Sequence, residues 1–171
     1  MRRKIVPKSR YMPFLGCVLL AFVLAGCGGI RIISDYDETT DKSLTAIQEQ
    51  TDAFISALVK SSGTEDAAFE KNKAFYDRID QQLRQLEFRV NSIPRNEQTI
   101  ALVKKIRTVI LGEGKCSGEG PSLRDLHCMS QNESKGPSAT SLEICRRNIN
   151  QTISAALSLE LAKKQGLEKN K

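Results

Sequence analysis

The chain of 171 residues contains no tryptophan, a single histidine and only 5% aromatic residues. Proteins that bind single-stranded nucleic acid stack the bases on aromatic side chains set among basic residues. No basic stretch in this sequence has that composition. We therefore discard nucleic acid as a partner, and one histidine leaves little material for histidine-based acid–base catalysis.

The sequence also lacks an apolar run of membrane-spanning length. Its longest apolar stretch covers residues 11–24 and is interrupted by Pro13 and Gly16, whereas a spanning helix needs about 20 consecutive apolar residues. Basic residues followed by a short apolar run indicate a secretory signal peptide, here residues 1–26. The basic residues, with no acid among them, are Arg2, Arg3, Lys4, Lys8 and Arg10.

The apolar stretch ends at Leu24-Ala25-Gly26-Cys27. This motif resembles the lipobox of bacterial lipoproteins at all four positions. The resemblance implies that a diacylglycerol is joined to the Cys27 sulfur, that cleavage falls between Gly26 and Cys27, and that the new amine is acylated. Because two acyl chains hold a protein stably on a membrane, the first expected partner is the lipid bilayer. A secreted protein with a coincidental cysteine is the alternative.

Residue 28 is glycine rather than aspartate. Aspartate at that place marks bacterial lipoproteins for retention in the inner membrane, so the resemblance implies an anchor in the outer membrane, facing the periplasm. Residues 27–34 would form the lipidated N-terminus and a short tether. Residues 35–171 would form one helical domain, because a mature chain of this length is the size of an ordinary domain.

The net charge of +6 belongs mainly to the signal peptide. Five of the 26 basic residues precede Cys27, so the mature chain has a net charge of +1. Within it, residues 28–80 hold six basic and eleven acidic side chains, whereas residues 81–171 hold fifteen and nine. An acidic half that folds against a basic half explains this asymmetry. A bipolar surface that orients a partner is the sharper alternative.

Apolar residues recur every three or four positions in four segments, which predicts an all-α fold, an antiparallel helical hairpin or bundle of about four helices. We expect the first helix to start at an N-cap on Ser34, and the second to start at a cap on Thr64 and to end before Pro94. Their predicted buried residues are Leu44, Ile47, Thr51, Phe54, Ile55, Leu58 and Val59 in the first, and Ala68, Phe75, Ile79, Leu83, Leu86 and Val90 in the second.

A third helix is predicted over residues 100–110, followed by a Gly-rich loop, residues 112–138, with at most one helical turn around residues 122–129. The last helix is expected to begin at a capping box, Thr140-Ser141-Leu142-Glu143. Lys163 and Lys164 suit its C-terminal end, where cations are favoured. The predicted buried stripe of this helix is Leu142, Cys145, Ile149, Ile153, Leu157 and Leu161.

These helices, with the phrases Ser34-Asp35-Tyr36-Asp37 and Thr40-Asp41-Lys42-Ser43-Leu44-Thr45-Ala46, resemble a group of small helical lipoproteins from Gram-negative bacteria. The resemblance covers residues 30–110. It implies a helical body behind a lipid anchor, and it supplies no activity, substrate or cofactor.

Three cysteines follow Cys27, and a periplasmic protein lies in an oxidising compartment where thiols pair. A Cys116–Cys128 bridge would close about 13 residues of the loop and stabilise the fold by up to about 3 kcal/mol. Cys145 falls in the predicted apolar stripe, so it is either a small core residue or the partner of one of the other two. The sequence leaves all three pairings open.

Three candidate motifs fail on spacing or on residue type. His127 beside Cys128 suggests a metal site with Cys116 and Cys145, but the paired C-x₂₋₄-C spacing of structural zinc sites is missing. The segment 112–117 lacks the first glycine and the Ser or Thr of a phosphate loop, and Ser117 lacks the spacing of a nucleophile elbow. We predict no catalytic residue, metal or cofactor, and we interpret the carboxylates as solvated helix positions.

The chain ends in Lys171. In this it is similar to the murein lipoprotein, a far shorter single helix whose C-terminal lysine is joined to peptidoglycan. The sequence as a whole predicts a membrane-anchored periplasmic lipoprotein, a non-catalytic interaction or envelope-structural protein with an envelope protein as partner. An enzyme with no visible motif and a peptidoglycan link through Lys171 are the alternatives.

Overall fold

A computed structural model describes residues 33–113, 122–129 and 135–168. Every regular element in these ranges is helical, so the predicted all-α fold is confirmed. None of the helices found there is long and apolar enough to cross a membrane. The elements are α2 (Glu38–Ser61), the 3-10 turn η1 (Glu65–Ala67), α3 (Phe69–Asn91), α4 (Glu97–Leu111), α5 (Leu123–Met129) and α6 (Ala139–Glu168).

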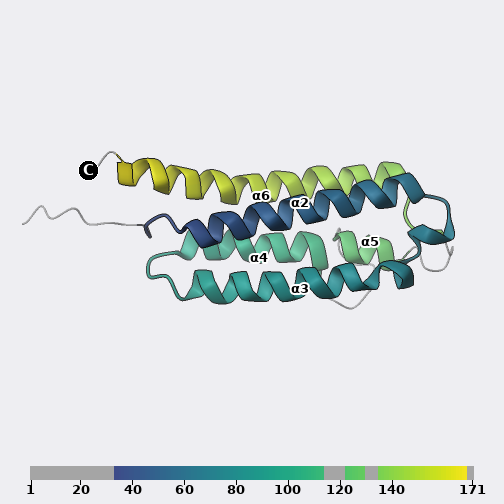
Figure 1. Cartoon of the computed structure of the whole chain (residues 1–171), viewed down its shortest axis with the longest axis horizontal. Helices are drawn as coiled ribbons and strands as arrows, with labels where there is room; N and C mark the ends of the chain where they lie inside the picture. The colour runs from purple at the N-terminus through teal and green to yellow at the C-terminus, as the bar shows by residue number, and fades with distance from the viewer. Residues whose placement is uncertain (1–32, 114–121, 130–134, 169–171) are drawn as a thin grey trace, which may run out of the picture. The chain divides into compact units, whose positions relative to one another are not determined.

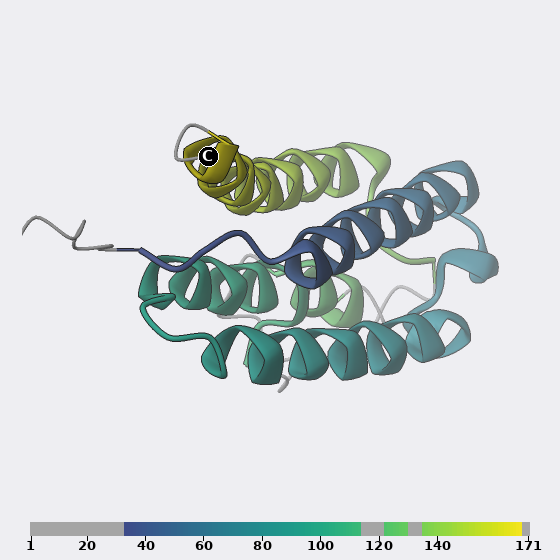
Figure 2. The same ribbon diagram turned by 60° about the vertical axis from the view of Figure 1, so that its left-hand side comes forward.

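The four long helices run alternately in opposite directions and form an antiparallel bundle (Figures 1 and 2). Helix α2 packs against α3 and α6, and α4 packs against the same two helices on the other side. We call the end of the bundle where α2 begins the entry end; α3 and α6 finish there and α4 starts there (Figure 1). The opposite end is the far end.

The predicted stripes of the first two helices form the core. All their apolar members are buried except Phe54 and Val59, which are partly buried and pack against the core, and Ala68, which is half-buried. Helix α4 adds buried residues at the predicted spacing: Val103, Ile106 and Ile110. Burying aliphatic stripes of this length is the main source of stability for such a bundle, because isolated helices are marginal in water.

Two predicted helix starts are wrong. Asp37, not Ser34, caps α2, since its carboxylate accepts a hydrogen bond from the backbone N–H of Thr40. The second long helix starts at Phe69, because residues 65–67 form the separate 3-10 turn and Thr64 makes no capping hydrogen bond. The end before Pro94 is confirmed, since α3 stops at Asn91.

The loop between α4 and α6 contains a two-turn helix rather than the single turn at most that the sequence predicts. Helix α5 follows α4 along the bundle and contacts both α4 and α3 (Figure 1). Ser122 caps it by accepting a hydrogen bond from the N–H of Asp125 at 3.0 Å. Since α4 has only 15 residues, about 22 Å, α5 fills core space that α4 leaves open beside the longer α3.

The predicted start and the predicted face of the last helix both need correction. Ser138 caps α6 through the N–H of Ser141, ahead of the predicted box. Leu142, Ile149 and Ile153 are buried as predicted, whereas Leu161 is 55% exposed. After Ile153 the buried positions are instead Ala156, Glu160 and Lys163.

Candidate functional site

A buried ion pair closes the entry end of the bundle. Glu160 and Lys163, one turn apart on α6, have 1% and 3% of their side chains exposed, and Lys163 Nζ lies 2.6 Å from Glu160 Oε1. The ammonium also donates to Thr99 Oγ1 at 2.7 Å and to Asn96 Oδ1 at 2.8 Å. All three of its hydrogens therefore have acceptors, which a buried charge requires.

The same network holds the segment that precedes α2. Ser34 Oγ donates to Asn96 Oδ1 at 2.8 Å, and Ser34 N donates to Arg95 O at 2.8 Å. Glu160 Oε2 accepts from the N–H of Asp37 at 3.4 Å. Side chains from the first segment, the α3–α4 turn and α6 thus meet in one layer. Ser34 belongs to the folded bundle rather than to the tether.

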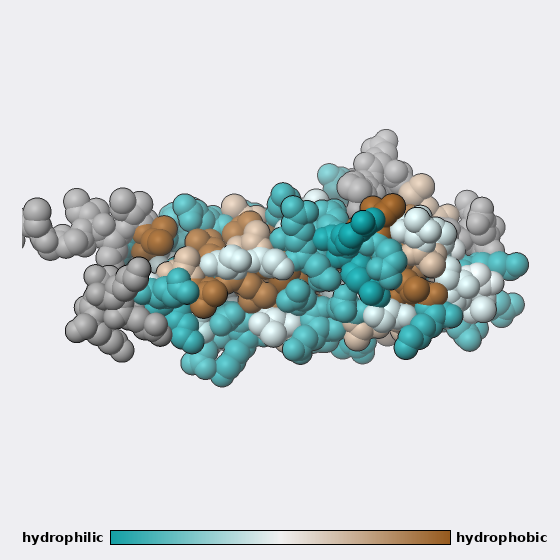
Figure 3. All heavy atoms as spheres, turned by 90° about the horizontal axis from the view of Figure 1, so that it is seen from above, coloured by the Kyte–Doolittle hydropathy of each residue, from teal (hydrophilic) through white to brown (hydrophobic). Residues whose placement is uncertain are grey.

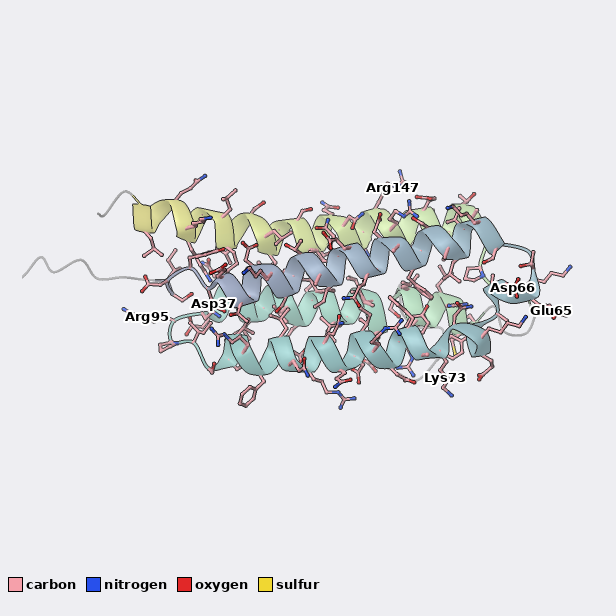
Figure 4. All side chains as sticks on the ribbon, viewed as in Figure 1. Asp37, Glu65, Asp66, Lys73, Arg95 and Arg147 are labelled. Atoms are coloured by element: carbon pink, nitrogen blue, oxygen red, sulfur yellow. The ribbon has the colours of Figure 1, made fainter. Side chains whose placement is uncertain are left out.

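Asp37 forms a second link across the entry end. Its carboxylate accepts two hydrogen bonds from the Arg89 guanidinium, at 2.6 Å and 3.0 Å, and also caps α2. The hydrogen bonds from Arg89, and then those from Thr40, lower the pKa of Asp37 from 3.8 to about 2 despite its partial burial. This residue therefore fixes the start of α2 to the end of α3; Figure 4 labels it beside Arg95.

Next to this link, a groove of about 330 Å³ lies between α2 and α3. Buried Ile47 and Leu86 form part of its floor. Two polar links cross from α2 to α3 on either side of it: Asp37 with Arg89, and Gln50 with Gln82, whose amide nitrogen lies 3.1 Å from the Gln50 oxygen. The residues around the groove are Thr39, Ser43, Ala46, Ile47, Gln82, Gln85, Leu86 and Arg89.

The groove offers apolar surface with uncharged hydrogen-bonding groups around it. Apart from Arg89, which is paired with Asp37, no residue in its lining is charged. Ser, Thr and Gln side chains can each donate and accept, and pockets that bind ligands combine a mainly apolar lining with a few such groups. A catalytic acid or base is absent from this lining.

His127 lies in an aromatic cluster at the other half of the bundle. It is fully buried, and its ring nitrogens have separate partners: Nε2 donates to Ala67 O and Nδ1 accepts from the Tyr76 hydroxyl, both at 2.8 Å. Burial lowers the pKa of the imidazole, and the bond to Ala67 opposes that shift. The neighbours that pack their rings against it are Phe54, Phe69 and Tyr76. This histidine holds α5 against α3.

At most one of the three predicted cysteine pairings can form. Cys145 is a half-buried free thiol, so pairings of Cys145 with Cys116 or Cys128 are not formed. Cys128 is buried and is not a free thiol. Cys116 lies outside the described residues, and the Cys116–Cys128 bridge stays a prediction. Burial raises the pKa of the Cys145 thiol, which makes it less reactive.

Several predicted sites fall outside the part of the chain that the structure describes: the lipidation site Cys27 with the cleavage position Gly26, and the C-terminal Lys171. Within the described ranges, no group of three or more His, Cys, Asp or Glu side chains is placed to hold a metal ion. His127 and Cys128 adjoin in sequence, but the imidazole nitrogens face Ala67 and Tyr76.

Comparison with known proteins gives no relative. No protein-family model, curated protein or solved structure matches the chain.

The entry-end network is the part of the site that sequence reasoning missed. The interpretation of the carboxylates as solvated helix positions is wrong for Glu160, which is buried together with Lys163. The sequence does contain a signal for this. Ile153, Ala156, Glu160 and Lys163 continue the three- and four-residue spacing of the stripe as well as Leu157 and Leu161 do. An acid and a base at positions i and i+3 can neutralise each other in a buried place.

Proposed function

We propose that this protein is a lipid-anchored envelope protein that binds a protein partner and performs no catalysis. The observation that carries the proposal is the fixed position of Ser34. Because Ser34 belongs to the bundle, at most six residues, 28–33, separate it from the lipidation site that the lipobox implies, which makes seven residue steps from Cys27 to Ser34. Seven extended residues reach roughly 25 Å. The bundle would therefore stay close to the membrane, and the groove between α2 and α3 opens in its membrane-side half.

The chemistry of the described side chains supports a binding role. The buried side chains of His127 and Glu160 are both engaged in hydrogen bonds inside the fold. The groove instead offers an apolar floor and neutral polar walls. Peptide segments bind such surfaces through apolar anchors and a few hydrogen bonds. We take a segment of an envelope protein as the partner.

The anchor is tested by the mass and the location of the mature protein. Intact-mass analysis of the purified protein should show Cys27 as the first residue with a diacylglyceryl group and an amide-linked acyl chain. Cys27→Ser should leave the membrane fraction, since the acylated thiol is lost. An unmodified Cys27, or an unchanged membrane location of Cys27→Ser, would contradict the lipoprotein proposal.

The groove is tested by photo-crosslinking in intact cells, with a benzophenone amino acid at Ser43 or Gln85. Both positions line the groove from opposite helices, so both should give an adduct of the same mass. Arg147, exposed on the outer side of α6 (Figure 4), is the matched control and should not. Ala46→Arg, which fills the groove, should remove the adduct. Adducts that Ala46→Arg leaves unchanged would rule out the groove as the binding surface.

A further inference from the structure

The entry end of the bundle carries apolar side chains that no part of the described structure covers. Leu161 is 55% exposed and Ile33 is 41% exposed, and Pro94 is also exposed in the α3–α4 turn. In the space-filling view, apolar side chains show in the left half, toward this end, and also in the right half (Figure 3). The tip of the far end is charged: Figure 4 labels Glu65 and Asp66 there.

Polar and aromatic side chains at the entry end are of the types found where proteins meet the membrane interface. Lys164 Nζ lies 5.6 Å from the centre of the Tyr36 ring, and Arg95 is exposed beside the apolar turn. Tyrosine, with an apolar ring and a polar tip, and long basic side chains are the residues enriched where protein meets lipid headgroups. Leucine and isoleucine gain free energy when they leave water for the acyl boundary.

Among the side chains that the structure describes at this end, the charges nearly cancel. Arg95 and Lys164 are balanced by the exposed acids Asp35 and Glu97. Two further acids of this end have basic partners: Asp37 pairs with Arg89, and Glu38 pairs with Lys42 at 2.7 Å. The end therefore has little reason to prefer anionic lipid over zwitterionic lipid, since electrostatic attraction needs a net positive patch.

We propose that the entry end rests on the headgroup region of the bilayer, with Leu161, Ile33 and the α3–α4 turn in contact with lipid and the far end directed away from it. The inference depends on the proposed lipid anchor. The occupant is a lipid surface because the chain between Cys27 and Ile33 is too short to let this end move far from it. An uncovered apolar end in that place would meet lipid before any other surface.

The absence of tryptophan makes a clean test possible. The acylated full-length protein carries a single tryptophan probe, Leu161→Trp at the entry end or Lys73→Trp near the far end, in vesicles of zwitterionic phosphatidylcholine. Both positions are exposed, so neither substitution disturbs the core. With lipids brominated on their acyl chains, the emission of Leu161→Trp should fall roughly twofold, because a contacting side chain lies at the headgroup–acyl boundary. The emission of Lys73→Trp should stay unchanged, and added salt should alter neither.

Any other result of the vesicle experiment would contradict the lipid contact, the orientation of the bundle or the lipid anchor. If the protein floats with the vesicles but Leu161→Trp is not quenched, the anchor stands and the contact of the entry end is wrong. If Lys73→Trp is quenched as strongly as Leu161→Trp, the bundle lies along the membrane and the orientation is wrong. If the protein does not float with the vesicles, the proposed lipid anchor itself fails.

A third probe, Ile93→Trp in the α3–α4 turn, checks that the lipid contact is shared between this turn and α6. Its quenching is measured with and without the additional substitution Leu161→Asp, which places a charge in the part of the proposed contact that α6 forms. Leu161→Asp should weaken the quenching of the Ile93→Trp probe. Unchanged quenching would mean that Leu161 takes no part in the contact.

Discussion

Lys163 Nζ lies 2.6 Å from Glu160 Oε1, and solvent reaches almost nothing of either side chain. Taking two charges out of water costs several kcal/mol per ion, and their attraction with the surrounding hydrogen bonds only offsets that cost. The stability of the fold should therefore fall strongly when one partner of the pair is lost and much less when both are lost. That asymmetry makes the entry end testable.

For the ion pair, we expect Glu160→Leu or Lys163→Met alone to lower the free energy of unfolding by about 3–5 kcal/mol, because each leaves one buried charge unpaired. The double variant should be far closer to the wild type, since no buried charge remains. Urea denaturation of all four proteins measures the coupling between the two positions. Additive losses in the double variant would mean that the two charges do not compensate each other.

For the cap on α2, Asp37→Ala should lower the free energy of unfolding by about 1–2 kcal/mol, the usual range for a lost N-cap. Asp37→Asn is the matched control, because asparagine also caps helices but cannot pair with Arg89. Since the folded pKa of Asp37 is about 2 against 3.8, its carboxylate contributes stability above about pH 3.8 that is lost as the pH falls toward 2. This part of the acid dependence should vanish in Asp37→Asn. Equal acid profiles for wild type and Asp37→Asn would contradict the assigned pKa.

For His127, the sign follows from a folded pKa below the ordinary 6.5. The unfolded chain binds a proton that the folded chain resists, so stability is complete above about pH 6.5 and declines as the pH falls below it. One proton gives a slope of at most about 1.4 kcal/mol per pH unit. Thermal denaturation between about pH 7.5 and about pH 5 should show this decline in the wild type and not in His127→Gln. A decline of the same size in both proteins would assign it to other groups.

For the cysteines, Cys145 should react with iodoacetamide more slowly in the folded protein than in the unfolded protein, because that thiol is half-buried and unpaired and burial raises its pKa. Peptide mapping without reduction should then find Cys116 joined to Cys128. Cys116→Ser should lower the free energy of unfolding by up to about 3 kcal/mol. Three reactive thiols in the unfolded protein would exclude the bridge.

Two glycines in connecting segments, Gly63 between α2 and η1 and Gly136 before α6, provide a test substitution and its control. Both have positive φ, 69° and 85°, so an alanine at either place is strained. A Cβ at Gly136 would clash with the carbonyl oxygen of Ala67, whereas one at Gly63 meets nothing within 4 Å. Gly63→Ala should cost about 1 kcal/mol, and Gly136→Ala clearly more. Equal melting temperatures of the two variants would show that the loop yields at Gly136.

The sequence predicted an element correctly wherever a single physical signal determined it. Period-3.6 apolar spacing located all four long helices and the buried stripe of α2 and α3. It failed where two signals competed. Ser34 and Asp37 are both good cap residues, and Arg89, 52 positions away in the chain, favours Asp37. The burial of Glu160 also depends on Thr99, 61 positions away in the chain, which only the folded bundle brings to it.

The loop of residues 112–138 shows a limit of a different kind. Its glycines predicted irregular backbone, but the S-x-x-D pattern of Ser122 and Asp125 also matches a helix start, and the structure places α5 there. A seven-residue helix is too short to form on its own. It depends on packing of His127 and Cys128 against the bundle, contacts that no local pattern encodes.

An even number of antiparallel helices returns a chain to the side from which it started. Helix α6 ends at Glu168 on the same side as Ser34. In the proposed orientation, a peptidoglycan strand joined to Lys171 would have to approach the membrane side, so the length of the bundle would not span the distance between lipid and cell wall. An epitope tag fused after Lys171 should likewise be shielded by the membrane, whereas one inserted at Gly63 should be open to antibody.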